Sequence, residues 1–493
     1  MRFERQSGVF LHLTSLPSPH GIGDMGAGAR QFIDFLARAD QSLWQFCPLG
    51  PTSGAHGNSP YQAYSAFAGN PLLVDLRNLA ERGYLDERDL DPPAECSPHE
   101  ARYDRVAEFK ERHLRNAHGN FEDAEDPDAF AAFCDREAEW LDDYALFMSL
   151  KAEFGGNLWT EWPHDVKTRD PDTLADYREQ LHDEIRYHKF VQWVFDEQWQ
   201  AMADYAEDHG VGLVGDLPIY VALDSADVWS DPDVFRLDEQ NNPTEVAGVP
   251  PNPGDDGQRW GNPVYDWETL RETDYDWWMR RFQRLFDQCD IARIDHFKGF
   301  DEFWAVPAEA DSPAAGRWVE GPGTHFFQRV QDRLGELPFL VEDLGFLDES
   351  ITALRDEFDF PGMRVPQYAD WCESGHMYQP MHYPEDCVGY TSTHDTDTIV
   401  GFYRELGDRQ RDCLEHNLGT DGVDIEWDMI EAVWNSNAVI AMTTVQDLLG
   451  LDSDARFNTP GTATGNWRWR VTEDGLNGDI ARRLGQITDI TIR

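Results

Sequence analysis

The chain of 493 residues carries 93 acidic and 41 basic side chains, for a formal net charge of −52, and 13% of its residues are aromatic. The aromatic content excludes a disordered acidic protein, and the charge excludes nucleic acid and anionic membranes as partners, since both bind clustered positive charge. Because no run of eighteen apolar residues and no signal-peptide profile is present, we expect a soluble cytoplasmic protein.

Lysine is rare among the basic residues. Only five of the 41 basic side chains are lysines, and the rest are arginines. A strongly negative net charge strains a compact fold through self-repulsion, and molar salt screens this repulsion within about 3 Å. The acidic, lysine-poor composition is typical of adaptation to a salt-saturated cytoplasm, so we expect a halophilic protein.

The seven cysteines are odd in number, scattered along the chain and without a CxxC pair. This pattern argues against a disulfide framework and against a zinc site. We therefore expect buried free thiols and no metal centre. No glycine loop that could cradle a phosphate is present either, so the sequence implies no cofactor.

Eight short apolar runs are predicted as buried strands. In chain order they span residues 9–16, 43–49, 211–221, 291–297, 339–344, 363–367, 388–393 and 439–445. Segments with helical spacing lie between many of them, at residues 29–38, 277–288, 326–334 and 351–358. Strands that alternate with helices predict a parallel sheet, and eight repeats predict a closed (β/α)8 TIM barrel. The pattern alone leaves an open doubly wound sheet as the alternative.

A barrel of this kind needs about 250 residues, so about half of the chain is predicted to be insertion. The largest candidate spans residues 70–210, a mainly helical insertion subdomain in which segments 137–154 and 184–209 have helical spacing. Such insertions normally lie over the C-terminal ends of the strands. No long linker is present, so residues 1–493 are predicted to form a single catalytic domain without a C-terminal β-domain.

Chemistry on a barrel is expected where the strands end. Three of the runs carry an acidic residue near or just after their end, namely Asp295, Glu342 and Asp395. Breaking a glycosidic bond with retention needs two carboxylates around an oxocarbenium-like transition state, and a third can bind sugar hydroxyls. The alternative for a single aspartate is a residue that caps the following helix. Three strands that end this way favour one catalytic cleft.

Arg293 lies two residues before Asp295 in the same run, so the alternation of a strand places both side chains on one face. An arginine beside a carboxylate favours its ionised form, which a nucleophile requires. A structural ion pair would give the same pattern in a single strand.

Longer motifs surround these positions. In one-letter code they are GVFLHLTSLP from residue 8, SPYQ from 59, GDLPIYV from 215, VAGVPP from 246, QRWGNP from 258 and NTPGT from 458. Together with the three carboxylate motifs, they make the chain from Gly8 to about Trp469 resemble the 4-α-glucanotransferases of glycoside hydrolase family 77, also known as amylomaltases or disproportionating enzymes.

The resemblance implies a role for each motif residue. Asp295 would be the nucleophile, Glu342 the general acid/base and Asp395 the transition-state stabiliser. The substrate would be bound by Ser59, Tyr61, Asp216, Gln258, Trp260, Arg293, His296, His394 and Asn458. By composition alone, Tyr61 is predicted as a core or turn residue and a single histidine as a core residue.

Trp260 lies among glycine, proline and asparagine residues, which favours an exposed platform over a core position. Aromatic faces pack against the C–H faces of glucose. The resemblance places residues 246–262 as an active-site lid loop over the acceptor side. The chain departs from the family pattern at the tip of this segment, residues 251–257, which carries no aromatic residue, and in residues 54–58, which carry no tyrosine.

The resemblance implies transfer of α-1,4-glucan segments between chains through a covalent intermediate, without cofactor or metal. Donors and acceptors would be maltooligosaccharides, amylose or starch-type chains, with glucose as an acceptor. The carboxylate motifs alone leave an α-amylase-type hydrolase as the alternative, since both enzymes form the same intermediate. The lid motifs and the lack of a recognisable C-terminal β-domain favour transfer. A non-catalytic glucan-binding protein would lack one of the carboxylates, and none is missing.

Overall fold

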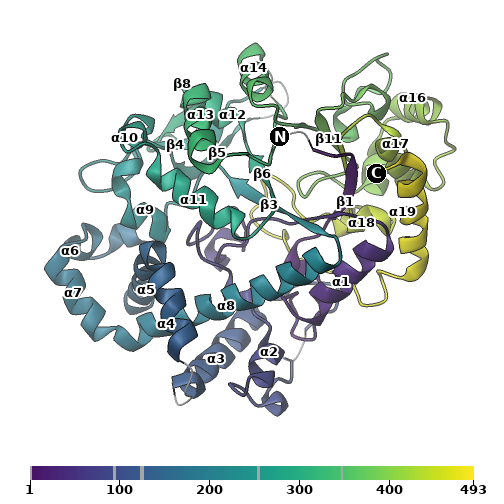
Figure 1. Ribbon diagram of the computed structural model, residues 1–493. Helices are drawn as coiled ribbons and strands as arrows, with labels where there is room; N and C mark the ends of the chain where they lie inside the picture. Colours follow the sequence, from purple (N-terminus) through teal and green to yellow (C-terminus); the bar gives the residue numbers. More distant parts are fainter. Residues whose placement is uncertain (1–2, 93–95, 123–126, 253–255, 346–347) are drawn as a thin grey trace.

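The computed structural model describes residues 3–92, 96–122, 127–252, 256–345 and 348–493, and its centre is a closed barrel of parallel strands (Figure 1). The strands follow one another around the barrel in the order β1, β12, β11, β10, β9, β6, β3, β2. Their bounds are β1 (Gln6–Phe10), β2 (Leu43–Gln45), β3 (Gly212–Pro218), β6 (Ile291–Asp295), β9 (Phe339–Val341), β10 (Gly362–Arg364), β11 (Cys387–Tyr390) and β12 (Ile440–Thr444). Each contains residues of one predicted run, so the TIM-barrel fold class is confirmed.

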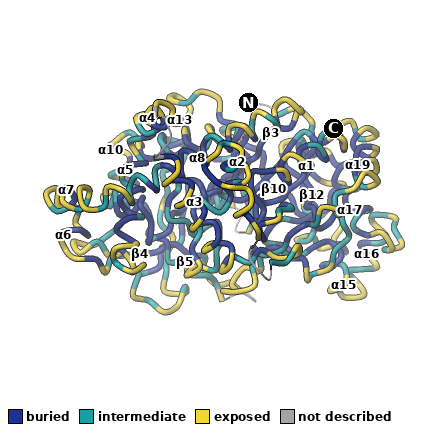
Figure 2. Tube along the Cα trace, turned by 90° about the horizontal axis from the view of Figure 1, so that it is seen from below, coloured by how far each residue is buried: buried dark blue, intermediate teal, exposed yellow. Residues whose placement is uncertain are grey.

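The barrel interior is closed by apolar side chains from seven of the eight strands or the residue next to them. They form one buried cluster: Leu43, Val214, Ile291, Leu340, Met363, Val365, Val388, Tyr390, Ile440 and Met442. Strands buried on both faces read as continuous apolar runs, which is why the sequence marks them clearly. Figure 2 shows the buried residues along the middle of the molecule and the exposed ones on outer loops and helix faces.

Helices surround the barrel and make up much of the chain that connects its strands. Their bounds are α1 (Ala27–Arg38), α2 (Leu76–Glu81), α3 (Tyr103–Glu122), α4 (Pro127–Arg136), α5 (Ala138–Glu153), α6 (His164–Lys167), α7 (Pro171–Gln180), α8 (His182–Asp208), α9 (Ala226–Ser230), α10 (Trp267–Glu272), α11 (Asp276–Phe286), α12 (Lys298–Asp301), α13 (Gly323–Leu334), α14 (Glu349–Glu357), α15 (Ile399–Glu405), α16 (Asp408–Leu418), α17 (Ile425–Asn435), α18 (Val445–Leu448) and α19 (Gly478–Thr491). All six segments with helical spacing overlap a helix, namely α1, α5, α8, α11, α13 or α14.

The connection between β2 and β3 holds the predicted insertion. Its regular elements in the described residues are helical, from α2 to α8. Helices α4–α7 lie on the opposite side of the molecule from α16, α17 and α19 (Figures 1 and 2). After β12, residues 445–493 form α18, a short 3-10 helix and α19, and no further sheet strand.

A second, antiparallel sheet was not predicted from the sequence. Its order is β5, β4, β7, β8, with bounds β4 (Glu245–Val249), β5 (Gln258–Pro263), β7 (Glu302–Pro307) and β8 (Arg317–Glu320). The segment 246–262 expected as a lid therefore consists largely of the hairpin β4–β5. Residues 253–255, at the tip of that segment, lie outside the described residues.

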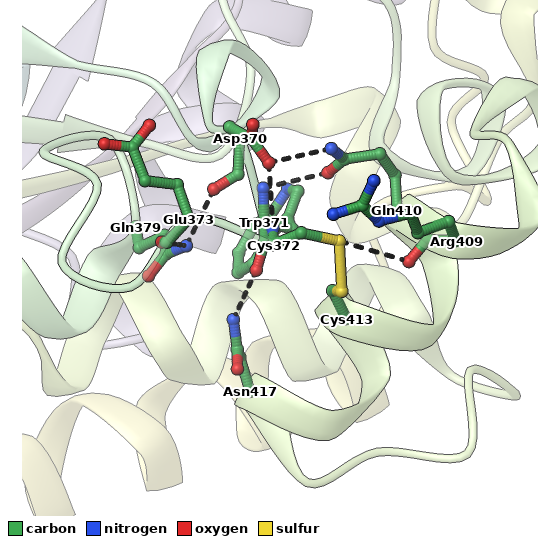
Figure 3. Close-up of a disulfide and its surroundings, with 9 residues drawn as sticks. All are labelled: Asp370, Trp371, Cys372, Glu373, Gln379, Arg409, Gln410, Cys413 and Asn417. Atoms are coloured by element: carbon green, nitrogen blue, oxygen red, sulfur yellow. Dashed lines mark hydrogen bonds between the residues drawn. A yellow bond between two sulfur atoms is a disulfide. The ribbon is translucent and has the colours of Figure 1, made fainter.

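The expectation that all cysteines are free is wrong for two of them. Cys372, in the connection after β10, forms a disulfide with Cys413 on α16 (Figure 3). Trp371 packs with Ile399 and Leu414 of neighbouring helices and so brings together two cysteines separated by 41 positions. Sequence spacing could not show this pairing, because it depends on the packing of one barrel connection against the next. The other five cysteines are free.

The five lysines are buried or half-buried, and none is fully exposed. Lys110, Lys151 and Lys298 are buried and pair with carboxylates. Lys189, which pairs with Asp142, and Lys167 are half-buried. Charge on the outer surface is therefore carried by carboxylates and arginines. No helix in the described residues is long and apolar enough to cross a membrane.

We expect the thermal melting temperature to rise between about 0.1 M and molar salt, as the screening length falls from about 10 Å to about 3 Å. The cause is the net charge of −52, whose self-repulsion salt weakens. Calorimetry in a potassium chloride series measures the effect, and sucrose, which stabilises without screening, is the control. A melting temperature that is flat in the salt series would refute the halophilic interpretation.

Candidate active site

The three acidic residues leave the barrel at one rim. Ile294 of β6 pairs with Val341 of β9, so the next residues, Asp295 and Glu342, lie at the same level where these neighbouring strands end. Asp395 follows β11, which is separated from β9 only by β10. Because all strands are parallel, their C-terminal ends open on the same face of the barrel.

Arg293 joins two carboxylates inside the barrel mouth. Its Nη1 donates to Oδ1 and Oδ2 of Asp216 at 2.7 and 2.8 Å, because β3 and β6 pair these two residues directly. The same nitrogen lies 2.9 Å from Oδ1 of Asp295, as strand alternation predicts. Burial opposes the charge on Arg293, but Asp216 and Asp295 outweigh it and raise the pKa of the guanidinium.

Two backbone N–H groups hold the side chain of Glu342, and its surroundings raise its pKa. The N–H of His296 donates to Oε2 at 3.0 Å, and the N–H of Leu344 donates to Oε1 at 2.8 Å. Burial and, next, the charge of Asp295 raise the pKa of Glu342 to about 7. His296 adopts a φ of 52°, a strained left-handed conformation of the kind found at active sites. Glu342 can therefore exchange a proton at neutral pH.

Asp395 has the opposite electrostatic environment. Its Oδ2 lies 3.1 Å from Nε2 of His394, and the Nδ2 of Asn458 donates to its Oδ1 at 2.6 Å. Burial acts to raise the pKa of Asp395, but the His394 contact and the Asn458 hydrogen bond lower it to about 2. In turn, Asp395 overcomes burial and raises the pKa of His394. The pKa values of Glu342 and Asp395, two acidic groups of one cleft, are thus well separated.

Tyr61 links these clusters from the loop after β2. Its hydroxyl donates to Oδ2 of Asp216 at 2.6 Å and lies 2.9 Å from Nε2 of His394. The ring of Tyr61 stacks on that of His394, with centroids 5.2 Å apart. Ser59, two residues earlier, accepts a hydrogen bond from the backbone N–H of Tyr61 at 3.3 Å.

Trp260 projects from β5 toward the catalytic residues. Its indole N–H donates to Oε1 of Gln258 at 2.8 Å, and its ring meets His296 edge-on at 4.9 Å between centroids. Burial lowers the pKa of His296 to about 4, so this imidazole is neutral at physiological pH. Two residues along the same strand, Asn262 donates to the carbonyl of Val221 at 2.8 Å, which ties β5 to the segment that follows β3.

These residues surround one cavity of about 710 Å³. Of the twelve predicted site residues, all but Asp216 line it: Ser59, Tyr61, Gln258, Trp260, Arg293, Asp295, His296, Glu342, His394, Asp395 and Asn458. Asp216 lies directly behind the wall, 4% exposed, and holds Arg293 and Tyr61. The structure thus brings the predicted site together.

Sequence reasoning did not single out three aromatic residues of the cavity wall, Tyr220, Tyr368 and Trp467. Tyr368 lies in the irregular connection after β10 and is 50% exposed. Its position just beyond a barrel strand was a signal that could have found it. Trp467 packs near Tyr61 at 5.8 Å between ring centroids, and it follows no predicted element.

Among the described residues, Asp301, Glu302 and Asp348 are close enough together to hold a metal ion. The amine of Lys298 lies within 3.0 Å of all three, at 2.8, 3.0 and 2.7 Å. It occupies the position that a cation would take, so this cluster is an ion-pair network that joins α12 to the start of α14.

Comparisons with known proteins agree on one family. The family model of 4-alpha-glucanotransferases matches residues 11–476. A 4-alpha-glucanotransferase from Synechocystis sp. is 44% identical over 497 residues, covering 99% of this chain and 98% of the relative, and one from Thermus thermophilus is 42% identical and covers both chains fully. The solved amylomaltase from Streptococcus agalactiae, in complex with acarbose, aligns with a TM-score of 0.96 at 36% identity, covering 99% of this chain and 100% of that one.

A closed parallel barrel with acidic groups at the rim of one cleft, one of them able to carry a proton near neutral pH, defines a class of barrel enzymes that act on glycosidic bonds. Within this class the matches span nearly the whole chain. The chain belongs to the 4-alpha-glucanotransferases of glycoside hydrolase family 77. It is an amylomaltase that acts on α-1,4-glucans.

Proposed function

We propose that the enzyme transfers glucan by a retaining double displacement with Asp295 as nucleophile and Glu342 as general acid/base. The observation that carries the proposal is the pair of carboxyl groups at the ends of adjacent strands, one held by Arg293 and the other with a pKa of about 7. A retaining mechanism needs one carboxyl group that attacks the anomeric carbon and a second, nearby one that can give up and take back a proton.

The reaction takes two steps at this pair of carboxyl groups. An oxygen of Asp295 attacks the anomeric carbon while Glu342 gives its proton to the glycosidic oxygen, and the shortened glucan leaves. In the second step Glu342 takes the proton of an acceptor 4-hydroxyl, which attacks the same carbon and releases Asp295. The backbone donors of His296 and Leu344 hold Glu342 in place for both proton transfers.

The remaining site residues bind the sugar before the scissile bond. Asp395, kept ionised by His394 and Asn458, stabilises the positive charge of the transition state and accepts sugar hydroxyls. Tyr61 stacks under the ring, while Arg293, His296 and His394 donate to its hydroxyls. Asp216 positions Arg293 and Tyr61 from behind the wall.

The acceptor enters beneath segment 246–262, which acts as the lid. Trp260 and Gln258 bind acceptor sugars, which are maltooligosaccharides, amylose or glucose. Bulk water far outnumbers any dissolved acceptor, so transfer requires that bound sugar reach the intermediate much faster than water. A lid that excludes water increases this bias.

Maltotriose is expected to yield glucose together with a ladder of longer maltooligosaccharides, with little gain in total reducing ends. Trp260→Ala should lower the ratio of transfer to hydrolysis about tenfold, because it removes an aromatic contact worth about 1.4 kcal/mol. Chromatography of the products and a reducing-end assay measure both quantities.

Trp318→Ala is the matched control, since Trp318 lies on β8 of the same small sheet and does not line the cavity. Its transfer ratio should match that of the unmodified enzyme. If the unmodified enzyme instead raises reducing ends steadily and builds nothing longer than its substrate, the hydrolase alternative replaces the proposed mechanism of transfer.

A further inference from the structure

A second cavity of about 360 Å³ adjoins the catalytic one. Tyr368 and Asp395 belong to the walls of both cavities, so the two spaces meet at these side chains. We call the second cavity the annex. Its walls include Gln367, Tyr368, Phe402, Glu405, Leu406 and Arg456. The residue motifs of the sequence contain none of these six, and no step of the mechanism above uses them.

The annex offers apolar surface beside unused hydrogen-bonding groups. Tyr368 is half-exposed, and Phe402 and Leu406, which line the same cavity, are partly buried. The carboxylate of Glu405 has no hydrogen-bond or ion-pair partner among the described residues. Apolar faces flanked by polar groups match a pyranose ring, whose C–H faces are apolar and whose edge carries hydroxyls.

Two further polar groups are held with a free edge. Gln367 donates its Nε2 to the carbonyl of Asp397 at 2.6 Å, so its Oε1 remains an acceptor. Arg456 donates from Nε to the carbonyl of Asn458 at 2.8 Å and from Nη2 to that of Asp395 at 2.6 Å, so its Nη1 remains a donor within the described residues. Fixed donors and acceptors bind hydroxyls with little loss of side-chain entropy.

The two walls of the annex are fastened to each other. Gln367 and Tyr368 lie on the connection after β10, whereas Phe402 and Glu405 lie on α15 and Leu406 directly follows it. Trp371 of the first connection is buried against α15, and the disulfide Cys372–Cys413 binds that connection to α16 (Figure 3). Asn417 of α16 also donates to the carbonyl of Trp371 at 2.8 Å. The annex is therefore a preformed site.

The charges around the annex favour a neutral ligand over an anionic one. Arg456 and Glu405 balance each other, and Asp395 and Asp397 add negative charge to the wall. The whole chain carries a net charge of −52, which repels phosphorylated sugars and nucleotides. A neutral polyol is the chemical class that these walls fit.

We propose that the annex is an additional glucosyl-binding subsite, which holds sugar units of the glucan farther from the scissile bond than those in the catalytic cavity. The inference rests on the proposed function of that cavity. A chain that passes Tyr368 continues into the annex, where Glu405 accepts hydroxyl hydrogen bonds and Leu406 contacts the ring. The enzyme gains specificity for longer glucans from these contacts.

The test compares Glu405→Ala with Glu431→Ala. Glu431 is an equally exposed glutamate on α17 that lines neither cavity. The measured quantity is the ratio of kcat/KM for maltoheptaose to kcat/KM for maltotriose. Loss of a hydrogen bond to a charged group should lower this ratio about tenfold in Glu405→Ala. In Glu431→Ala the ratio should not change.

A binding measurement makes the result independent of turnover. In the Asp295→Asn background, calorimetric titration with maltoheptaose should give a Kd about tenfold higher when Glu405→Ala is added, at an unchanged melting temperature. An unchanged ratio together with an unchanged Kd, or equal losses for both substrates, would overturn the subsite. Failure of the proposed function is distinct, since the unmodified enzyme would then form no maltooligosaccharide ladder from maltotriose.

Discussion

Replacement of Asp295 by asparagine is expected to abolish glucan transfer, with a loss of kcat of about four orders of magnitude or more. An amide cannot form the glycosyl ester, so the covalent route closes. The variant should fold, because the side chain keeps its shape and its carbonyl oxygen can still accept from Arg293. Product formation from maltotriose and the melting temperature measure the two effects.

Asp412→Asn is the control for this experiment, since Asp412 is exposed on α16 and outside the cavity. Its activity should equal that of the unmodified enzyme. Mass spectrometry supplies a direct test: a fluorinated donor that traps the intermediate should label the peptide containing Asp295. Retention of more than about one hundredth of the activity in Asp295→Asn, or a label elsewhere, would contradict the assignment of the nucleophile.

Replacement of Glu342 by glutamine is expected to lower kcat/KM for maltotriose by about 10² to 10⁴, the contribution of a general acid. The first step should be spared with a maltosyl fluoride donor, because fluoride leaves without a proton. In the unmodified enzyme kcat/KM for maltotriose should fall as pH rises through about 7, since the acid must be protonated and its pKa is about 7. With the fluoride donor, Glu342→Gln should lack this alkaline limb.

Release of fluoride and its pH profile measure these outcomes. If the fluoride donor restores the first step in Asp295→Asn and not in Glu342→Gln, the two roles are reversed. A pH profile for maltotriose that stays level through pH 7 would mean that burial and Asp295 do not control the proton on Glu342.

The barrel could be predicted from the sequence because its strands are buried on both faces. Most of the predicted runs extend beyond the strands, however. Residues 9–16 were predicted where β1 ends at Phe10, because Leu11, Leu13 and Leu16 are buried beyond the strand. Apolar character reports burial and not the hydrogen-bonded ladder. The predicted catalytic residues could be singled out because they lie at or shortly after the ends of strands, within specific motifs.

The small sheet and the annex could not be predicted in the same way. Strand β8 reads Arg317-Trp318-Val319-Glu320, with little apolar alternation. It is recognisable as a strand only through its antiparallel pairing with β7. The walls of the annex come from three segments, which follow β10, β11 and β12 and whose residues carry no shared motif. Their proximity, like the disulfide that joins them, arises from the packing of Trp371 against α15 and α16.

The burial of lysines in ion pairs limits how the folded enzyme can be modified. Amine-directed reagents would find no fully exposed lysine side chain, because three of the five are buried and two are half-buried against neighbours. Acylation of those three amines would also take the cationic lysine partner away from the carboxylates that they hold. Attachment of the enzyme to a support or a dye should therefore use its abundant surface carboxylates, away from a cleft whose chemistry depends on Asp295 and Glu342.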